Sequence, residues 1–85
     1  MKVLIPGALL SYTGDAEVEA KGGTLGALFA DLDARYPGLR FRVIDEQDHF
    51  RANMRCFING YQSFDLAHPL TEQDEVAVIQ ALRGG

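Results

Sequence analysis

The chain has 85 residues, of which 47% are hydrophobic and 24% charged, so the composition predicts one globular domain rather than a disordered chain. Twelve acidic and eight basic residues give a net charge of −4, which argues against nucleic-acid binding because that binding depends on Lys and Arg at phosphates. A single cysteine excludes an internal disulfide and a four-cysteine metal cluster. The apolar run at residues 3–5 is too short for a signal peptide or a membrane span, so we expect a cytoplasmic protein.

The first two predicted elements are strands. Residues 2–5 form an apolar run before a Pro-Gly turn, which is typical of a central strand with both faces buried. Residues 8–14 are interpreted as a loop. Residues 17–20 alternate polar and apolar side chains, and their charges favour a position at the edge of the sheet.

The next element is the main helix, predicted between residue 24 and residues 36–38. Its apolar positions recur at helical spacing, and they are Leu25, Leu28, Phe29 and Leu32. Thr24 is the expected N-cap, and the Tyr-Pro-Gly sequence at residues 36–38 ends the helix.

The second half of the chain predicts three more strands. Residues 39–53 show no clear helical or strand pattern. Phe41, Val43 and Phe50 are the candidates for side chains that anchor this segment to the core. Residues 54–58 and 61–64 flank an Asn-Gly turn, and residues 75–81 form the last strand.

This order of elements predicts an α+β fold, a β-grasp (ubiquitin-like) roll. A right-handed crossover places the one main helix on one face of a mixed sheet of about four to five strands. The first and last strands are the most apolar, so we expect them side by side at the centre. We expect residues 1–85 to form a single domain, with residues 82–85 as a flexible C-terminal tail.

Side chains offer little catalytic chemistry. Cys56 alternates with Met54 and Ile58 and is interpreted as a core residue. His49 and His68 stand in separate polar segments, so we expect no metal site. Five carboxylates are interpreted as solvated surface groups, namely Asp31, Asp33, Asp45, Glu46 and Asp48.

The C-terminus carries the chemistry that the side chains lack. Residues 81–85 can extend about 17 Å beyond the last strand, far enough to enter a pocket on another protein. Gly84 and Gly85 have no Cβ atoms and can pass through a narrow channel. A carboxylate is unreactive toward nucleophiles, but joining it to AMP would create a leaving group that sulfur can replace. The pattern therefore predicts a main-chain terminus as the reactive group.

Short segments along almost the whole chain follow one family pattern: residues 24–28, 36–39, 57–60, 63–65, 68–71 and 74–78, and Gly84 with Gly85. Their order and spacing resemble the ThiS/MoaD family of ubiquitin-like sulfur carriers. The final sequence Leu-Arg-Gly-Gly also resembles the end of ubiquitin itself.

The resemblance implies that an ATP-dependent adenylating enzyme activates Gly85. A sulfur donor protein would then supply the sulfur of a covalent thiocarboxylate at Gly85, and a downstream biosynthetic enzyme would accept it. The ATP is used by the partner enzyme, so we expect no bound cofactor. The chain itself would be a protein substrate and carrier rather than an enzyme, without nucleic-acid or membrane partners.

Alternatives stay open at this point. The sulfur could serve molybdopterin, thiamin or cysteine biosynthesis, or a secondary metabolite; in the molybdopterin case the chain would be the small subunit of the synthase. A second hypothesis is a ubiquitin-like modifier that is conjugated to lysines through Gly85. A third is an interaction module whose diglycine is incidental.

Strand alternation predicts a face for partner binding. If Cys56 points inward, Phe57 points to the opposite face, and alternation in the last strand places Ile79 there as well. Alternatively, residues 39–53 cover Phe57. The residues expected to contact partners are Phe57, Ile79, Leu82 and Arg83. We also expect the acidic body to be steered toward a basic partner surface.

Overall fold

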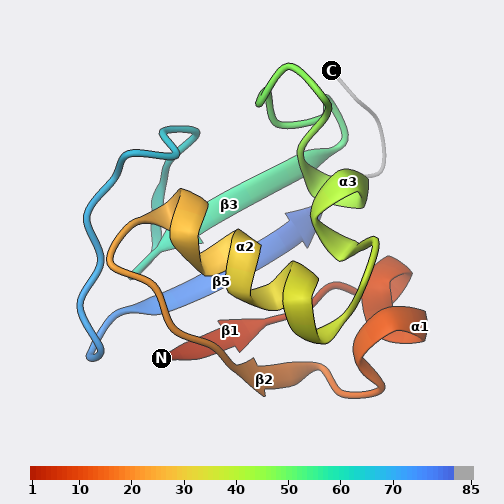
Figure 1. The fold of residues 1–85 in the computed structure, drawn as a ribbon, viewed down its shortest axis with the longest axis horizontal. Helices are drawn as coiled ribbons and strands as arrows, with labels where there is room; N and C mark the ends of the chain where they lie inside the picture. Colours follow the sequence, from red (N-terminus) through yellow and green to blue (C-terminus); the bar gives the residue numbers. More distant parts are fainter. Residues whose placement is uncertain (82–85) are drawn as a thin grey trace.

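A computed structural model describes residues 1–81, and residues 82–85 lie outside the described part of the chain. Five strands form one mixed sheet in the order β2-β1-β5-β3-β4, and α2 and α3 lie over one of its faces (Figure 1). The strands are β1 (Lys2–Leu4), β2 (Glu17–Glu19), β3 (Met54–Ile58), β4 (Tyr61–Gln62) and β5 (Glu75–Gln80). The helices are η1 (Gly7–Leu9), α1 (Leu10–Thr13), α2 (Leu25–Arg35) and α3 (Leu39–Val43).

The pairing of the strands confirms the predicted α+β roll. β1 is parallel to β5 and antiparallel to β2, so the first and last strands are neighbours inside the sheet. β3 is antiparallel to both β5 and β4. β2 lies at one edge, as its charged alternation predicts, and β4 at the other.

The main helix forms as its sequence pattern predicts. The side-chain oxygen of Thr24 accepts a hydrogen bond from the amide of Ala27 at 3.1 Å, which satisfies one of the unpaired amides of the first turn. The helix ends before Gly38, whose φ of 95° is a left-handed conformation that suits glycine. Its apolar stripe is completely buried against the sheet, namely Leu25, Leu28, Phe29 and Leu32.

Two carboxylates of α2 have a structural role that sequence reasoning missed. Asp31 accepts a hydrogen bond from the amide of Lys21 at 2.9 Å. Asp33 accepts hydrogen bonds from the amides of Gly38 and Arg40, at 3.1 and 3.2 Å. Their interpretation as merely solvated groups is wrong, because both satisfy backbone amides where the chain enters and leaves the helix layer.

The interpretation of residues 8–14 as a loop is also wrong. η1 and α1 follow one another there, and Gly14 ends them with a φ of 76°. Leu9 is completely buried, so tertiary packing stabilises two helical turns that are too short to be stable alone.

Residues 39–53 begin with another short helix, α3. Leu39, Val43 and Ile44 are buried, whereas Phe41, a candidate anchor, is 54% exposed. Val43 is therefore an anchor as expected, and the prediction for Phe41 is wrong.

The core fills the space between the helices and the inner face of the sheet. Alternate strand residues point into it, namely Val3, Met54, Cys56, Ile58, Val76 and Val78. Phe50 packs against this core and meets the ring of Phe29 edge to face, with the ring centroids 6.0 Å apart. Within residues 1–81, no helix has the length and apolar character needed to cross a membrane.

Candidate functional site

The sheet fixes the point at which the tail (residues 82–85) begins. β3 pairs with β5 from Val76 to Gln80, and just beyond it the amide of Ala81 donates a hydrogen bond to the carbonyl of Asn53 at 2.8 Å. Ala81 is the last described residue. The predicted site residues Leu82, Arg83, Gly84 and Gly85 lie outside the described residues, so their roles stay predictions.

The face of the sheet opposite α2 carries a row of apolar side chains. Phe57 pairs with Ala77, and Ala77 pairs with Leu4, so the three lie side by side across β3, β5 and β1. Ile79 lies on the same face, opposite Arg55, and is 45% exposed. We call Leu4, Phe57, Ala77 and Ile79 the outer apolar row.

Sequence alternation brought Phe57 and Ile79 to one face correctly, but it missed Leu4. Finding Leu4 requires the register of β1 against β5, which the alternation inside one strand does not reveal. The alternative that residues 39–53 cover Phe57 is disfavoured, because Leu39 and Val43 of that segment are buried on the helix side of the sheet. Partner binding by Phe57 and Ile79 stays a prediction.

Cys56 is not a reactive thiol. Its side chain is completely buried at the inner face of β3, and this burial raises the pKa of the Cys56 thiol to about 12. At neutral pH the group is therefore protonated, and a thiol rather than a thiolate is a poor nucleophile. Because it is the one cysteine of the chain, sulfur chemistry has no activated side chain to use.

The two histidines lie apart. His49 is exposed in the turn after α3, and His68 has its Nδ1 atom 3.4 Å from the hydroxyl oxygen of Ser63. Residues 1–81 contain no cluster of three or more His, Cys, Asp or Glu side chains that could hold a metal ion.

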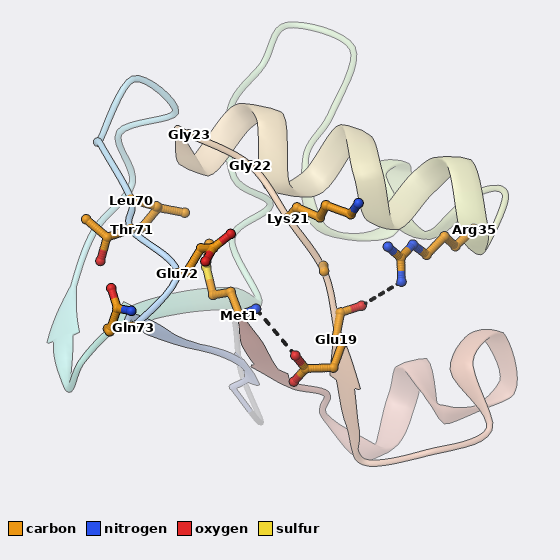
Figure 2. Close-up of a pocket in the computed structure, with 11 residues that line it drawn as sticks. Met1, Glu19, Lys21, Gly22, Gly23, Arg35, Leu70, Thr71, Glu72 and Gln73 are labelled. Carbon is orange, nitrogen blue, oxygen red and sulfur yellow. Dashed lines mark hydrogen bonds and ion pairs between the residues drawn. The ribbon is translucent and has the colours of Figure 1, made fainter.

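A pocket of about 800 Å³ opens at the end of the sheet where β1 and β5 begin (Figure 2). It lies between Met1, the segment from Glu19 to Gly23, and the loop from Leu70 to Gln73. β5 runs away from this pocket for six residues, which is about 20 Å of strand. The pocket is therefore remote from the start of the tail.

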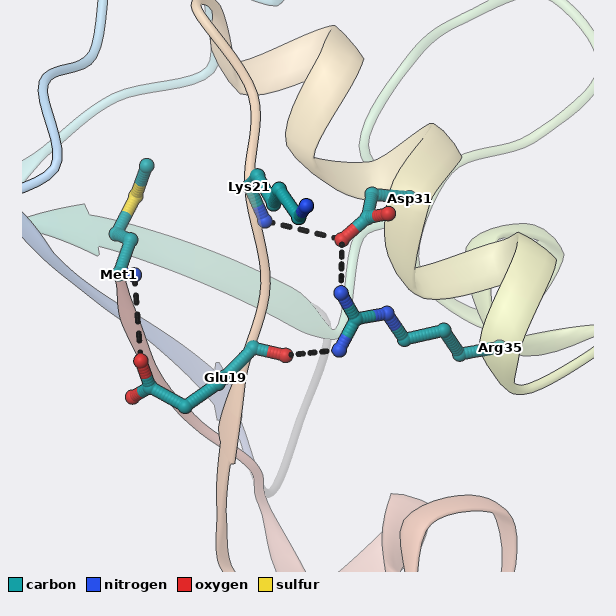
Figure 3. Close-up of polar contacts among 5 residues, drawn as sticks. All are labelled: Met1, Glu19, Lys21, Asp31 and Arg35. Atoms are coloured by element: carbon teal, nitrogen blue, oxygen red, sulfur yellow. Dashed lines mark hydrogen bonds and ion pairs between the residues drawn. The ribbon is translucent and has the colours of Figure 1, made fainter.

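Charged groups around this pocket pair with one another (Figure 3). The amine of Met1 lies 3.4 Å from the carboxylate of Glu19, and the Arg35 guanidinium donates a hydrogen bond to the Glu19 carbonyl at 3.0 Å. Arg35 also lies 3.4 Å from the carboxylate of Asp31. These contacts tie β2 to α2, and they account for the charges of Met1, Glu19 and Arg35 without a ligand.

A mixed sheet whose first and last strands are parallel neighbours, with a main helix across one face, places this chain in the β-grasp class of proteins. Solved structures share this fold along the whole chain. The crystal structure of CysO from Mycobacterium tuberculosis has a TM-score of 0.88 and 31% sequence identity, over 95% of this chain and 98% of that one. The crystal structure of the Amycolatopsis orientalis BexX/CysO complex contains a chain with a TM-score of 0.88 and 27% identity, over 99% of this chain and 98% of that one.

The family is equally clear from the sequence comparison. The model of the ThiS family matches residues 3–85, which include the terminal diglycine. The sulfur carrier protein CysO of Mycobacterium tuberculosis is 33% identical over 91 residues, which cover 98% of this chain and 96% of that relative. This chain belongs to the ThiS family, which confirms the resemblance drawn from its motifs.

Proposed function

We propose that this chain is a sulfur carrier protein and that Gly85 is the residue that carries the sulfur. The observation that carries the proposal is the match to the ThiS family, which extends through Gly85. The relatives named sulfur carrier protein CysO support it along almost the full length of the chain. The inert thiol of Cys56 supports it as well, because it leaves the main-chain terminus as the group available for sulfur.

The proposed chemistry has two steps, the first at the α-phosphate of ATP and the second at the carbonyl carbon of Gly85. A carboxylate oxygen of Gly85 attacks the α-phosphate of ATP on an adenylating enzyme, so that pyrophosphate leaves and an acyl-adenylate forms. Sulfur at the oxidation level of sulfide, supplied by a sulfur donor protein, then attacks that carbon. The bond from carbon to the AMP oxygen breaks, AMP leaves, and a thiocarboxylate remains. A downstream biosynthetic enzyme accepts the sulfur.

In this scheme the chain is a protein substrate rather than a catalyst, and ATP binds to the partner. The β-grasp body serves as a handle that partner enzymes recognise while the tail enters their active sites. We place these reactions in the cytoplasm. The name of the Amycolatopsis complex supports docking of this kind, because a CysO protein is found there together with BexX.

Similarity to CysO favours cysteine biosynthesis among the pathways that the sequence left open. The names of the CysO relatives give no support to the small subunit of molybdopterin synthase. Solved structures named small archaeal modifier protein 1 are 21–23% identical to this chain and share the fold alone, so they do not favour conjugation to lysines. The pathway would be established by an enzyme that forms cysteine from the sulfur of the loaded protein. The same enzyme should form no cysteine from free sulfide at the same concentration.

The intact mass of the protein tests the proposal directly. After incubation with the adenylating enzyme of the same organism, ATP and a sulfur donor, we expect the mass increase that replacement of one oxygen by sulfur produces. Fragmentation should place the change at Gly85, and omission of ATP should abolish it. An unchanged mass in the complete mixture would contradict the carrier function.

The outer apolar row makes a separate prediction about docking. Ile79→Ser should raise the KM of the adenylating enzyme for this protein about tenfold, because it removes an exposed apolar contact at the centre of a protein interface. The kcat and the unfolding temperature should change little, since Ile79 is not part of the core. Steady-state kinetics of pyrophosphate release measure both constants.

Tyr61→Ser is the matched control for this experiment. Tyr61 is 80% exposed, but it lies in the edge strand β4 and outside the outer apolar row. Equal effects of the two substitutions on KM would show that the row has no special role in docking.

A further inference from the structure

The positive charge of this acidic protein is concentrated in one segment. Residues 40–55 contain four arginines and three acidic side chains. The rest of the chain contains four basic and nine acidic side chains. The net charge of −4 therefore comes from outside residues 40–55.

This segment lies where the tail begins. The amide of Ala81 bonds to the carbonyl of Asn53, and the amide of Arg51 donates a hydrogen bond to the carbonyl of Val43 at 2.9 Å. Arg51 is thereby placed beside the last turn of α3, which carries Arg42. Arg55 lies in β3 opposite Ile79, next to the outer apolar row. We call Arg42, Arg51 and Arg55 the tail-end arginines.

The tail-end arginines differ in their partners from three other basic residues of the described chain; Lys21 also forms no ion pair there. Lys2, Arg35 and Arg40 each form an ion pair with a carboxylate. Within residues 1–81, the tail-end arginines form none. The nearby Asp45 has its pKa lowered chiefly by the hydrogen bond from the amide of His49, with Arg51 a smaller contribution.

Neutral groups hold these guanidinium groups instead. Arg51 donates through Nε to the carbonyl of Phe41 at 2.6 Å, and its guanidinium lies 4.4 Å from the centre of the Phe41 ring. Arg55 donates to the carbonyl of Ala52 at 2.6 Å. Carbonyl and aromatic partners restrict the side chain without neutralising its charge, so little conformational entropy is lost when an anion binds.

Arg42 completes the set on the helix side. Its guanidinium lies over the ring of Tyr12, 5.8 Å from the ring centre, and approaches the Tyr12 hydroxyl oxygen at 3.4 Å. Tyr12 belongs to α1, so this contact joins α1 to α3 at the end of the molecule where β5 finishes (Figure 1).

We propose that the tail-end arginines dock against an acidic surface of the adenylating enzyme, around the entrance that receives the tail. This proposal rests on the proposed function. The net charge led us to expect a basic partner surface, and the proposal reverses that expectation. The part of the protein that approaches the entrance is positive, while the remainder is negative. The resulting asymmetry would orient the protein during encounter, with the tail toward the enzyme.

The test uses the adenylating enzyme that loads the wild-type protein in the mass experiment. The triple variant R42Q/R51Q/R55Q should lower kcat/KM about tenfold at low ionic strength, and the dependence of kcat/KM on salt should flatten. Circular dichroism and the unfolding temperature establish that the variant is folded. The single variant Arg42→Gln, which removes no backbone hydrogen bond, should show a smaller effect of the same kind.

Lys21→Gln is the matched control. It changes the net charge by the same amount as Arg42→Gln, but Lys21 is exposed at the remote pocket. We expect its kcat/KM to stay within about twofold of wild type, because steering depends on where the charge lies. An equal effect of both substitutions would overturn the proposal and leave only a net-charge effect.

Two further outcomes would also overturn it. If the triple variant kept the kcat/KM and the salt dependence of the wild type, the arginines would take no part in docking. The carrier function would still be supported by the mass increase of the wild-type protein. A change confined to the KM for ATP would assign the arginines to phosphate groups instead of a protein surface. Failure of the wild-type protein to load would be a failure of the proposed function itself.

Discussion

Moving the terminal carboxylate by one residue is expected to abolish sulfur loading. Deletion of Gly85 shortens the chain by about 3.4 Å, and addition of one glycine after it lengthens the chain by the same distance. Because reacting atoms must approach within about 3–3.5 Å in the correct orientation, either change should lower the rate of adenylation at least about 100-fold. The measurement is the rate of pyrophosphate release together with intact mass.

The two length variants keep the folded body unchanged, which separates chemistry from stability. The buried core extends from Val3 to Val78, so the unfolding temperature of both should match that of the wild type. Gln80→Ala, which alters an exposed side chain in β5 and keeps the chain length, should load normally. Efficient loading of both length variants would refute the assignment of Gly85 as the reacting residue.

The largest expected loss of stability comes from Gly22→Ala. A Cβ atom at Gly22 would lie 2.5 Å from the amide nitrogen of Leu28 and 2.8 Å from the carbonyl carbon of Ala27. Both atoms belong to the backbone of α2, which cannot turn aside as a flexible side chain can. We expect a loss of about 2–3 kcal/mol in the free energy of unfolding. Urea denaturation measures this loss as a lower midpoint at an unchanged slope.

Gly23→Ala is the control for this substitution. A Cβ atom at Gly23 meets nothing within 4 Å, and its φ is not in the left-handed range. Alanine there should therefore be neutral or stabilising by about 0.4–1 kcal/mol, through a lower entropy of the unfolded chain. If the two variants were equally stable, the inference that α2 leaves no room for a Cβ atom at Gly22 would be wrong. For a domain of 85 residues, whose total stability is roughly 4–13 kcal/mol, the expected difference is large.

Features that short-range patterns control could be predicted from the sequence. The apolar stripe and Thr24 cap of α2 are local, and so is the Asn-Gly turn, where Asn59 and Gly60 adopt φ values of 51° and 87°. Alternation in β3 and β5 likewise placed Phe57 and Ile79 on one face.

The features that the sequence did not reveal depend on contacts between distant segments. η1 and α3 are too short to form on their own, and the buried Leu9 and Leu39 stabilise them only in the folded protein. Leu4 belongs to the outer apolar row because β1 pairs with β5 in a particular register, and these two strands are more than seventy residues apart in the sequence. The tail-end arginines look like scattered charges in the sequence, and only packing shows that none of them forms an ion pair within residues 1–81.

The parallel pairing of β1 with β5 has a practical consequence for experiments. Two parallel neighbours begin at the same end of a sheet, so the start of β1 and the finish of β5 face opposite directions. A fluorophore, an affinity handle or an entire fusion protein placed ahead of Lys2 would thus project away from an enzyme bound at the other end. Immobilisation on a surface through that position would leave the C-terminal end of the protein accessible. Enzyme binding and sulfur loading could then be followed on the same attached molecule.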